Sequence, residues 1–142
     1  MSASRESILN AVLAKIAATQ NFVTIGRRNR GSNAIGPAQS PALFLLGDSE
    51  RYETTIKFPR KLVLVQKLVY LNDVGSDPTL IPETAINNAL DALDTLLVPD
   101  YDGRCTLGGL VYSALIKGAV KKAPGDATGK SIAIVPLELM LP

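Results

Sequence analysis

The residues that most enzymes use for proton transfer near neutral pH are missing from this chain. It contains no histidine and a single cysteine, Cys105. Histidine is the usual general base at this pH, so serine–histidine and cysteine–histidine catalysis and HExxH zinc chemistry are excluded. Cys105 could act as a nucleophile only if a neighbouring group lowered the pKa of its thiol. We expect it instead to be a small, buried apolar side chain.

A glycine-rich stretch near the C-terminus is similar to a phosphate-binding loop. Residues 125–131 have the sequence GDATGKS. The phosphate-loop motif is G-x-x-x-x-G-K-[ST], whereas here the two glycines are one residue too close and Pro124 occupies the first glycine position. A phosphate loop also opens a helix, and a β-like run follows here. We therefore expect a hairpin turn, and a small nucleotide- or nucleic-acid-binding module remains the alternative of a different class.

Two pairs of carboxylates could bind ions or transfer protons. Asp100 and Asp102 flank a turn before Gly103, but the further oxygen ligands and the late glutamate of an EF-hand loop are missing. Asp91 and Asp94 lie on the polar side of a predicted helix and indicate solvation. We therefore predict no catalytic residue, no metal site and no cofactor. An enzyme that uses carboxylates or lysine remains a third hypothesis.

A small basic cluster, Arg27, Arg28 and Arg30, lies in the stretch 26–40, GRRNRGSNAIGPAQS. This stretch has no apolar periodicity, and its glycines and proline predict a long mobile loop. The arginines could contact phosphates or an acidic protein surface, or could simply be solvated. No aromatic residues lie between them, so stacking on single-stranded nucleic acid is not supported.

The composition is that of a folded protein. The chain has 142 residues, 46% hydrophobic and 20% charged, with a net charge of +2. This length predicts a single domain over residues 1–142, and the charge is too small for a dedicated nucleic-acid-binding protein. The N-terminal residues are polar, and the most apolar stretches, 62–71 and 132–141, are far shorter than the roughly 20 residues that span a bilayer. We expect synthesis in the cytoplasm, no signal peptide and no membrane contact.

Hydrophobic periodicity predicts two helices and several strands. Apolar residues at helical spacing predict helices over 4–18, with Ser4 as the N-cap, and 84–98, ended by Pro99. Strands are predicted over residues 22–25, 41–46, 51–56, 61–71, 107–120 and 132–141, with a turn at 47–49; for 51–56 a helix remains open. The fold class is α+β: one domain with an antiparallel or mixed sheet, two main helices packed on one face, and the long mobile loop.

Two of these strands are apolar on both faces. In 61–71, valines alternate with leucines, which is typical of a central or covered strand. The closing strand 132–141 is expected to pair as a hairpin with the strand before it. Pro136 lacks a backbone donor and indicates an edge or a bulge. This strand could therefore add to a neighbouring subunit's sheet, through Ile132, Ile134, Pro136 and Glu138.

The layout as a whole resembles the tail terminator proteins of long-tailed bacteriophages, also known as minor tail or tail-completion proteins. The matching features are an opening helix, a loop ending in QSPALF, a long strand, a helix after a proline-rich connection, a TLGGLV run and a closing AIVPL strand. They lie at residues 5–16, 39–44, 61–71, 85–97, 106–111 and 133–137. The resemblance covers most of the chain and depends on apolar and turn patterns rather than on fixed chemical residues.

The resemblance implies a structural virion protein that is not an enzyme. Members of this family assemble into rings, as a rule hexameric, on the head-proximal end of the tail tube, where they stop tube polymerisation and provide the surface that joins the head. The implied partners are further copies of the chain, the tail tube protein, the head–tail connector or neck protein, and double-stranded DNA that passes through the ring without sequence specificity.

The same resemblance suggests roles for the arginine loop. In a ring, Arg27, Arg28 and Arg30 would line the channel or bridge subunits, and the loop would become ordered on assembly. The alternative within virions is a head-to-tail connector or neck ring protein. The double glycine of residues 108–109 and the closing strand favour the tail side.

Overall fold

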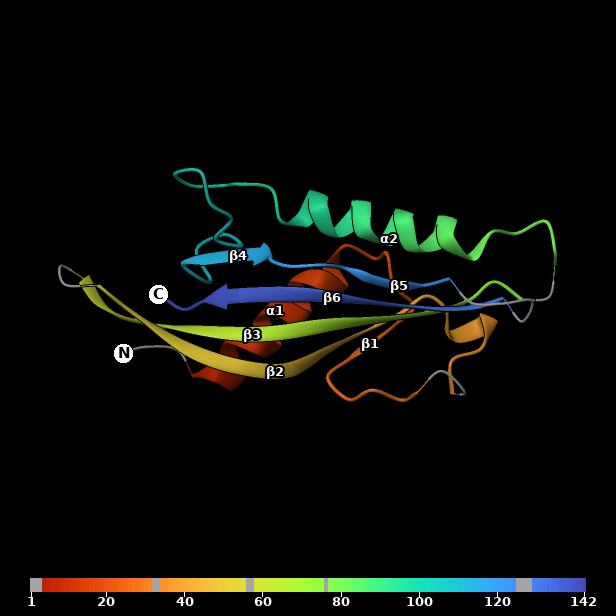
Figure 1. Ribbon diagram of the computed structural model, residues 1–142, viewed down its shortest axis with the longest axis horizontal. Coiled ribbons are helices and arrows are strands. Elements are labelled where there is room, and N and C mark those ends of the chain that lie inside the picture. The colour runs from red at the N-terminus through yellow and green to blue at the C-terminus, as the bar shows by residue number, and fades with distance from the viewer. Residues whose placement is uncertain (1–3, 32–33, 56–57, 76, 125–128) are drawn as a thin grey trace.

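The structure, a computed structural model, describes residues 4–31, 34–55, 58–75, 77–124 and 129–142, and these form two α-helices and a curled six-stranded sheet (Figure 1). The predicted α+β class is confirmed. The elements in chain order are α1 (Arg5–Ala18), β1 (Thr24–Gly26), the 3-10 turn η2 (Pro37–Gln39), β2 (Ala42–Thr55), β3 (Phe58–Asp73), α2 (Pro82–Leu96), β4 (Ser113–Ile116), β5 (Lys121–Ala123) and β6 (Lys130–Met140).

Both helices begin and end close to the predicted positions. The Ser4 hydroxyl oxygen accepts the Ser7 backbone N–H at 3.2 Å, so Ser4 is the N-cap of α1 as expected. Pro82 is at the start of α2, where its missing N–H costs no helical hydrogen bond.

The sheet is mixed, and its strands lie in the order β1-β2-β3-β6-β4, with β5 also paired to β6. β1 runs parallel to β2 and the other pairs are antiparallel. The turn predicted at residues 47–49 is wrong. The pairing with β3 continues past a register shift between Gly47 and Ser49, so a β-bulge absorbs the extra residue and β2 remains one strand.

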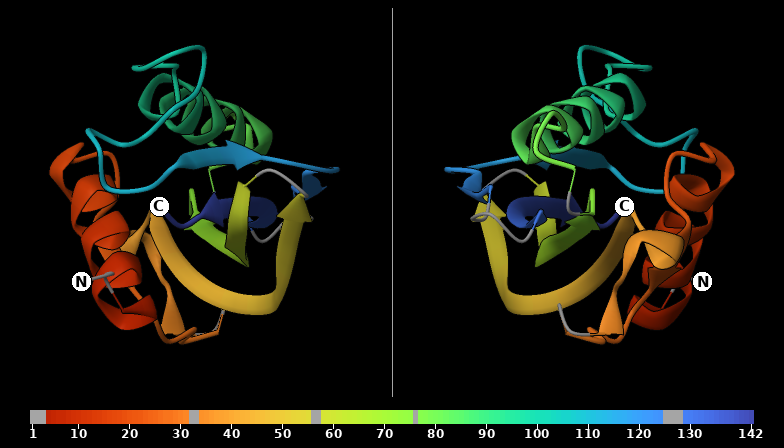
Figure 2. Two further views of the ribbon diagram at one scale, coloured as in Figure 1. Left: turned by 90° about the vertical axis from the view of Figure 1, so that its left-hand side faces the viewer. Right: turned by 90° about the vertical axis from the view of Figure 1, so that its right-hand side faces the viewer.

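Alternation along the strands divides the sheet into two faces. The odd-numbered residues of β6 from Ala133 to Leu139 point into a hydrophobic core that both helices share. From α1 this core receives Ile8 and Val12, and from α2 it receives Ile86 and Leu93. Both helices therefore cover the same face, as predicted, and Figure 2 shows them on one side of the curled sheet.

The opposite face carries a second, smaller core at one end of the sheet. Ile35 is buried there against Phe44, Val69 and Leu71. The structure thus differs from the long mobile loop expected over residues 26–40: Gly26 ends β1 and η2 forms a short turn, while residues 32–33 lie outside the described residues. The physical reason is that an apolar side chain of this otherwise polar stretch finds a hydrophobic position on the sheet.

The prediction that Pro136 marks an edge strand is wrong. β6 lies between β3 on one side and β4 and β5 on the other, as the predicted hairpin pairing also requires. The Pro136 carbonyl accepts the Lys117 N–H at 3.2 Å, so the side of Pro136 without a donor also faces the β4–β5 connection. There β4 has ended and β5 has not begun, so no ladder hydrogen bond is lost. Addition of β6 to a neighbour's sheet through its backbone is therefore blocked.

The two faces of β6 differ in what truncation should cost. Leu137 is 2% exposed in the helix-side core, whereas Ile134 is 36% exposed on the opposite face. We expect Leu137→Ala to lower the free energy of unfolding by roughly 2–5 kcal/mol, because it leaves a cavity. For Ile134→Ala we expect less than about 1 kcal/mol. Urea denaturation of both variants at low protein concentration measures this difference, and equal losses would contradict the assignment of the faces.

Candidate assembly surface

The side of the sheet away from α1 and α2 is only partly covered, and we call it the outer face. Residues that pair across neighbouring strands point to the same side of a sheet, so the strand register defines its members. Beyond the patch under Ile35 they include Ser49, Arg51, Val63, Val65, Lys67, Ser113, Leu115, Lys117, Lys121, Ile134, Pro136, Glu138 and Met140.

The four residues predicted as an inter-subunit strand all belong to this side of the sheet. Ile132, Ile134, Pro136 and Glu138 alternate along β6, so their side chains point the same way. Ile132 packs against the small core around Ile35, and the other three lie in the open part. Contact with another subunit through these residues therefore remains a prediction, but it would use side chains on a face rather than the backbone of an edge.

The open part of the outer face carries exposed and half-buried apolar side chains among its charged ones. Leu115 is 41% exposed and Ile134 is 36% exposed, and Val65, Pro136 and Met140 are half-buried. Within the described ranges, both α-helices lie on the other side of the sheet. A sheet face exposed to water normally carries polar residues. This apolar face is therefore a candidate for contact with another protein surface.

An ion-pair group borders this apolar area. Arg51 pairs with Glu138 and with Glu53, and the two carboxylates raise the pKa of its guanidinium. The Glu138 side chain is only 12% exposed. With Leu115 these residues line a shallow cavity of about 250 Å³. Glu138 is thus paired within the chain and orders Arg51 on the outer face.

The three arginines of the predicted contact loop differ in their surroundings. One Arg27 nitrogen donates to the Glu6 carboxylate at 2.8 Å and to the Asn10 side-chain oxygen at 3.1 Å, both on α1. This contact lowers the pKa of Glu6. Arg28 and Arg30 are exposed. Arg27 therefore fastens the segment after β1 to α1, and of the three only Arg28 and Arg30 are exposed enough to contact a partner.

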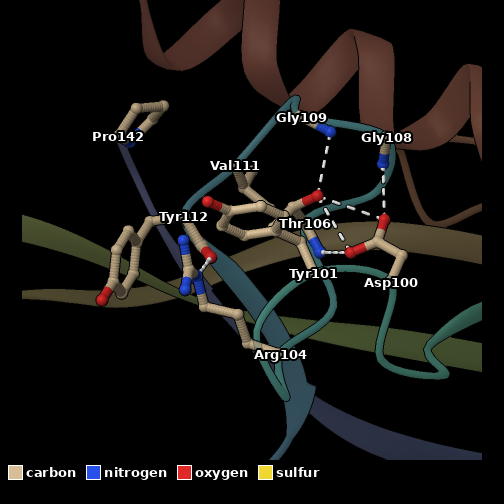
Figure 3. A pocket seen from close by; sticks show the side chains of 9 residues that line it. All are labelled: Asp100, Tyr101, Arg104, Thr106, Gly108, Gly109, Val111, Tyr112 and Pro142. Carbon is tan, nitrogen blue, oxygen red and sulfur yellow. Dashed lines mark hydrogen bonds between the residues drawn. The ribbon is translucent and has the colours of Figure 1, made fainter.

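A second feature is a cavity of about 580 Å³ above the turn that follows α2 (Figure 3). The Asp100 carboxylate accepts the backbone N–H groups of Thr106 at 2.7 Å and Gly108 at 2.9 Å, and also the Thr106 hydroxyl. The Gly108 and Thr106 hydrogen bonds lower the pKa of Asp100. Asp102 pairs with Arg104 at 3.4 Å. The two aspartates thus stabilise a turn, as predicted, and do not converge on a cation.

Arg104 lies between two tyrosines at the mouth of this cavity (Figure 3). Its guanidinium carbon is 4.2 Å from the ring centre of Tyr112 and 5.0 Å from that of Tyr101, and its Nε donates to the Tyr112 carbonyl oxygen at 2.9 Å. Tyr101 is 65% exposed. Sequence analysis missed this group, because eleven positions separate its aromatic residues. Exposed tyrosine and ordered arginine are typical of protein interfaces.

Two candidates from the sequence remain, the thiol of Cys105 and the glycine-rich stretch 125–131. Cys105 is buried, and burial raises the pKa of its thiol, which fits the inert side chain that was expected. Lys130 and Ser131 begin β6 rather than a helix, and residues 125–128 of the glycine-rich stretch lie outside the described residues. A phosphate loop would need a helix at this point.

The described part of the chain shows neither a metal-binding cluster nor a membrane-spanning helix. Among these residues, no three Cys, Asp or Glu side chains are grouped so that they could hold a metal ion. No helix among them has the length and apolar character to cross a membrane. Comparison of the sequence with models of known protein families and with curated proteins found no match.

The hydrogen bonds of Asp100 make a pH-dependent contribution to stability. Because the folded state lowers the pKa of this carboxyl, the stabilisation is complete above its unfolded pKa of about 4 and is lost as pH falls through the folded value. We expect Asp100→Asn to be less stable than the wild type near pH 7 and to lose less stability on acidification. Urea midpoints at about pH 7 and about pH 3 test this. Parallel losses in both proteins would contradict it.

Proposed function

We propose that this chain is a structural subunit of a ring, the tail terminator of a long-tailed bacteriophage. The observation that carries the proposal is the outer face, where half-exposed apolar side chains lie on a sheet side that neither helix covers. A face of this kind favours association with further protein, which a ring of identical subunits supplies. The sequence resemblance to tail terminators supplies the identity of the ring.

The proposed activity is assembly. A ring at the head-proximal end of the tail tube covers the last layer of tube protein, so that no further tube subunit can add. Its other side offers a surface to the connector or neck protein of the head. DNA passes through the centre, contacted only through its phosphates.

Several local features support a rigid ring subunit. The Asp100 turn fastens the connection between α2 and β4, and the Arg27 contacts fasten the segment after β1 to α1. Arg28 and Arg30 remain exposed on that fastened segment, where they could bridge subunits or face the channel. Association between ordered surfaces loses less conformational entropy than association between disordered ones.

Assembly of phage particles without this protein tests the function. We expect electron micrographs to show abnormally long tails that are not joined to filled heads, because tube growth then has no cap. Adding back the purified wild-type protein during assembly is the control and should restore normal lengths. Tails of normal length that fail to join heads would move the function to a head-to-tail connector or neck ring, and normal particles would contradict both.

A further inference from the structure

Charges of opposite sign lie on the outer face and on α2. The outer face presents Lys67, Lys117 and Lys121. On the other side of the sheet, α2 contains Glu83, Asp91 and Asp94 and not a single lysine or arginine. Figure 2 shows α2 above the side of the sheet that is opposite to the outer face. The lysines of the outer face and the carboxylates of α2 therefore lie on opposite sides of the sheet.

Two carboxylates of α2, Asp91 and Asp94, have no cation beside them among the described residues of the same chain. Glu83 is 3.6 Å from the Lys122 ammonium group, but Asp91 and Asp94 are exposed and form no ion pair with a described residue. Both lie in the C-terminal half of α2, whose last turn has no basic residue. The helix dipole is negative at this end, so carboxylates there are unfavourable unless cations approach them.

The basic side chains of the outer face form a row that could meet this pair. Lys67 and Lys117 flank Pro136 on β3 and after β4, so their backbones are roughly 10 Å apart, two strand spacings. Neither lysine is in an ion pair with a described carboxylate. The exposed Leu115 and Ile134 lie along the same strands, next to the row.

We propose that the outer face of one copy of this chain binds α2 of the next copy, with Lys67 and Lys117 against Asp91 and Asp94. The inference rests on the proposed ring and names its subunit contact. Because the two surfaces differ and lie on opposite sides of the subunit, the contact is head-to-tail. Such contacts form a closed ring where the rotation between successive copies closes and an open filament where it does not, and the proposed ring requires the first. It also gives the open sheet face a helical layer. The apolar side chains on the outer face favour protein over DNA as the occupant.

Charge reversal with complementation tests this contact. The sheet variant is Lys67→Glu with Lys117→Glu, and the helix variant is Asp91→Lys with Asp94→Lys. We expect the wild type to assemble with rising concentration in sedimentation velocity, and each variant alone to stay monomeric, because like charges then face each other. A mixture of the two variants should assemble again when they alternate. The acidic outer face of the sheet variant then meets the basic α2 of the helix variant, and the unchanged outer face of the helix variant meets the unchanged α2 of the sheet variant.

A matched control separates a specific contact from general attraction between oppositely charged proteins. Lys15→Glu with Arg60→Glu changes the net charge as the sheet variant does, at exposed positions off the outer face. We expect this control to assemble alone. When the two are mixed, the helix variant can place its unchanged outer face on α2 of the control but offers a reversed helix to the next copy, so it should end growing assemblies, whereas with the sheet variant it should be incorporated throughout. Circular dichroism should show wild-type folding for all variants. If the sheet variant misfolds, the single substitution Lys117→Glu takes its place, because the Lys117 side chain is exposed.

The remaining outcomes overturn the proposal in distinguishable ways. If both reversed variants assemble like the wild type, the contact is wrong while the ring stands. If only the sheet variant fails and the mixture does not recover, the outer face binds itself. If the sheet variant assembles normally but loses binding to random-sequence duplex DNA, the face is a nucleic-acid surface. A wild type that stays monomeric at every concentration contradicts the contact, whereas the tail-length experiment judges the function separately.

Discussion

The strict alternation of side chains along β3 and β6 is the constraint on which the rest of the molecule depends. Both strands carry apolar side chains on both faces, interrupted on the outer face by Lys67 and Glu138, so apolar parts of both faces favour burial. The chain has two helices in its described part, and both pack on the same face. Among the described residues, the small core around Ile35 covers the other face at one end. Apolar side chains such as Leu115 and Ile134 therefore remain exposed on that face.

The position of β6 in the sheet follows from the same constraint. A strand that is apolar on both sides is best placed in the interior, with a neighbour along each edge. Pro136 is accommodated there because the neighbouring chain is interrupted between β4 and β5, where Gly118 adopts a φ of +109°. The backbone edge of β6 is thus closed, and any subunit contact through β6 uses its side chains.

Several polar groups support this arrangement. The Asp100 carboxylate is satisfied by Thr106 and Gly108, Arg104 is held between two tyrosine rings, and Arg27 is bound to α1. Each of these groups fixes a connection between elements. Such fixed connections reduce the conformational freedom that the neighbouring surfaces would lose on association with another protein.

The sequence by itself determined the parts that depend on local pattern. Each of these parts is specified by residues that lie close together in the sequence. They are the apolar spacing along residues 5–18 and 82–96, the N-cap Ser4, the Asp100 turn and the strand β3. These gave the α+β class and the shared face of the helices. The four β6 residues predicted for subunit contact, Ile132, Ile134, Pro136 and Glu138, alternate along the sequence, so their position on one face of the strand could be predicted without the structure.

Only the tertiary structure decided what depends on partners distant in the sequence. The bulge at Gly47, the interior place of β6, the burial of Ile35 and the attachment of Arg27 each require a neighbour that local pattern does not specify. The same is true of the separation of charge between Lys67 and Lys117 on the sheet and Asp91 and Asp94 on α2. Local sequence sets which way each side chain points along its own element, but strand order and helix placement decide which of those directions meet another element and which meet water.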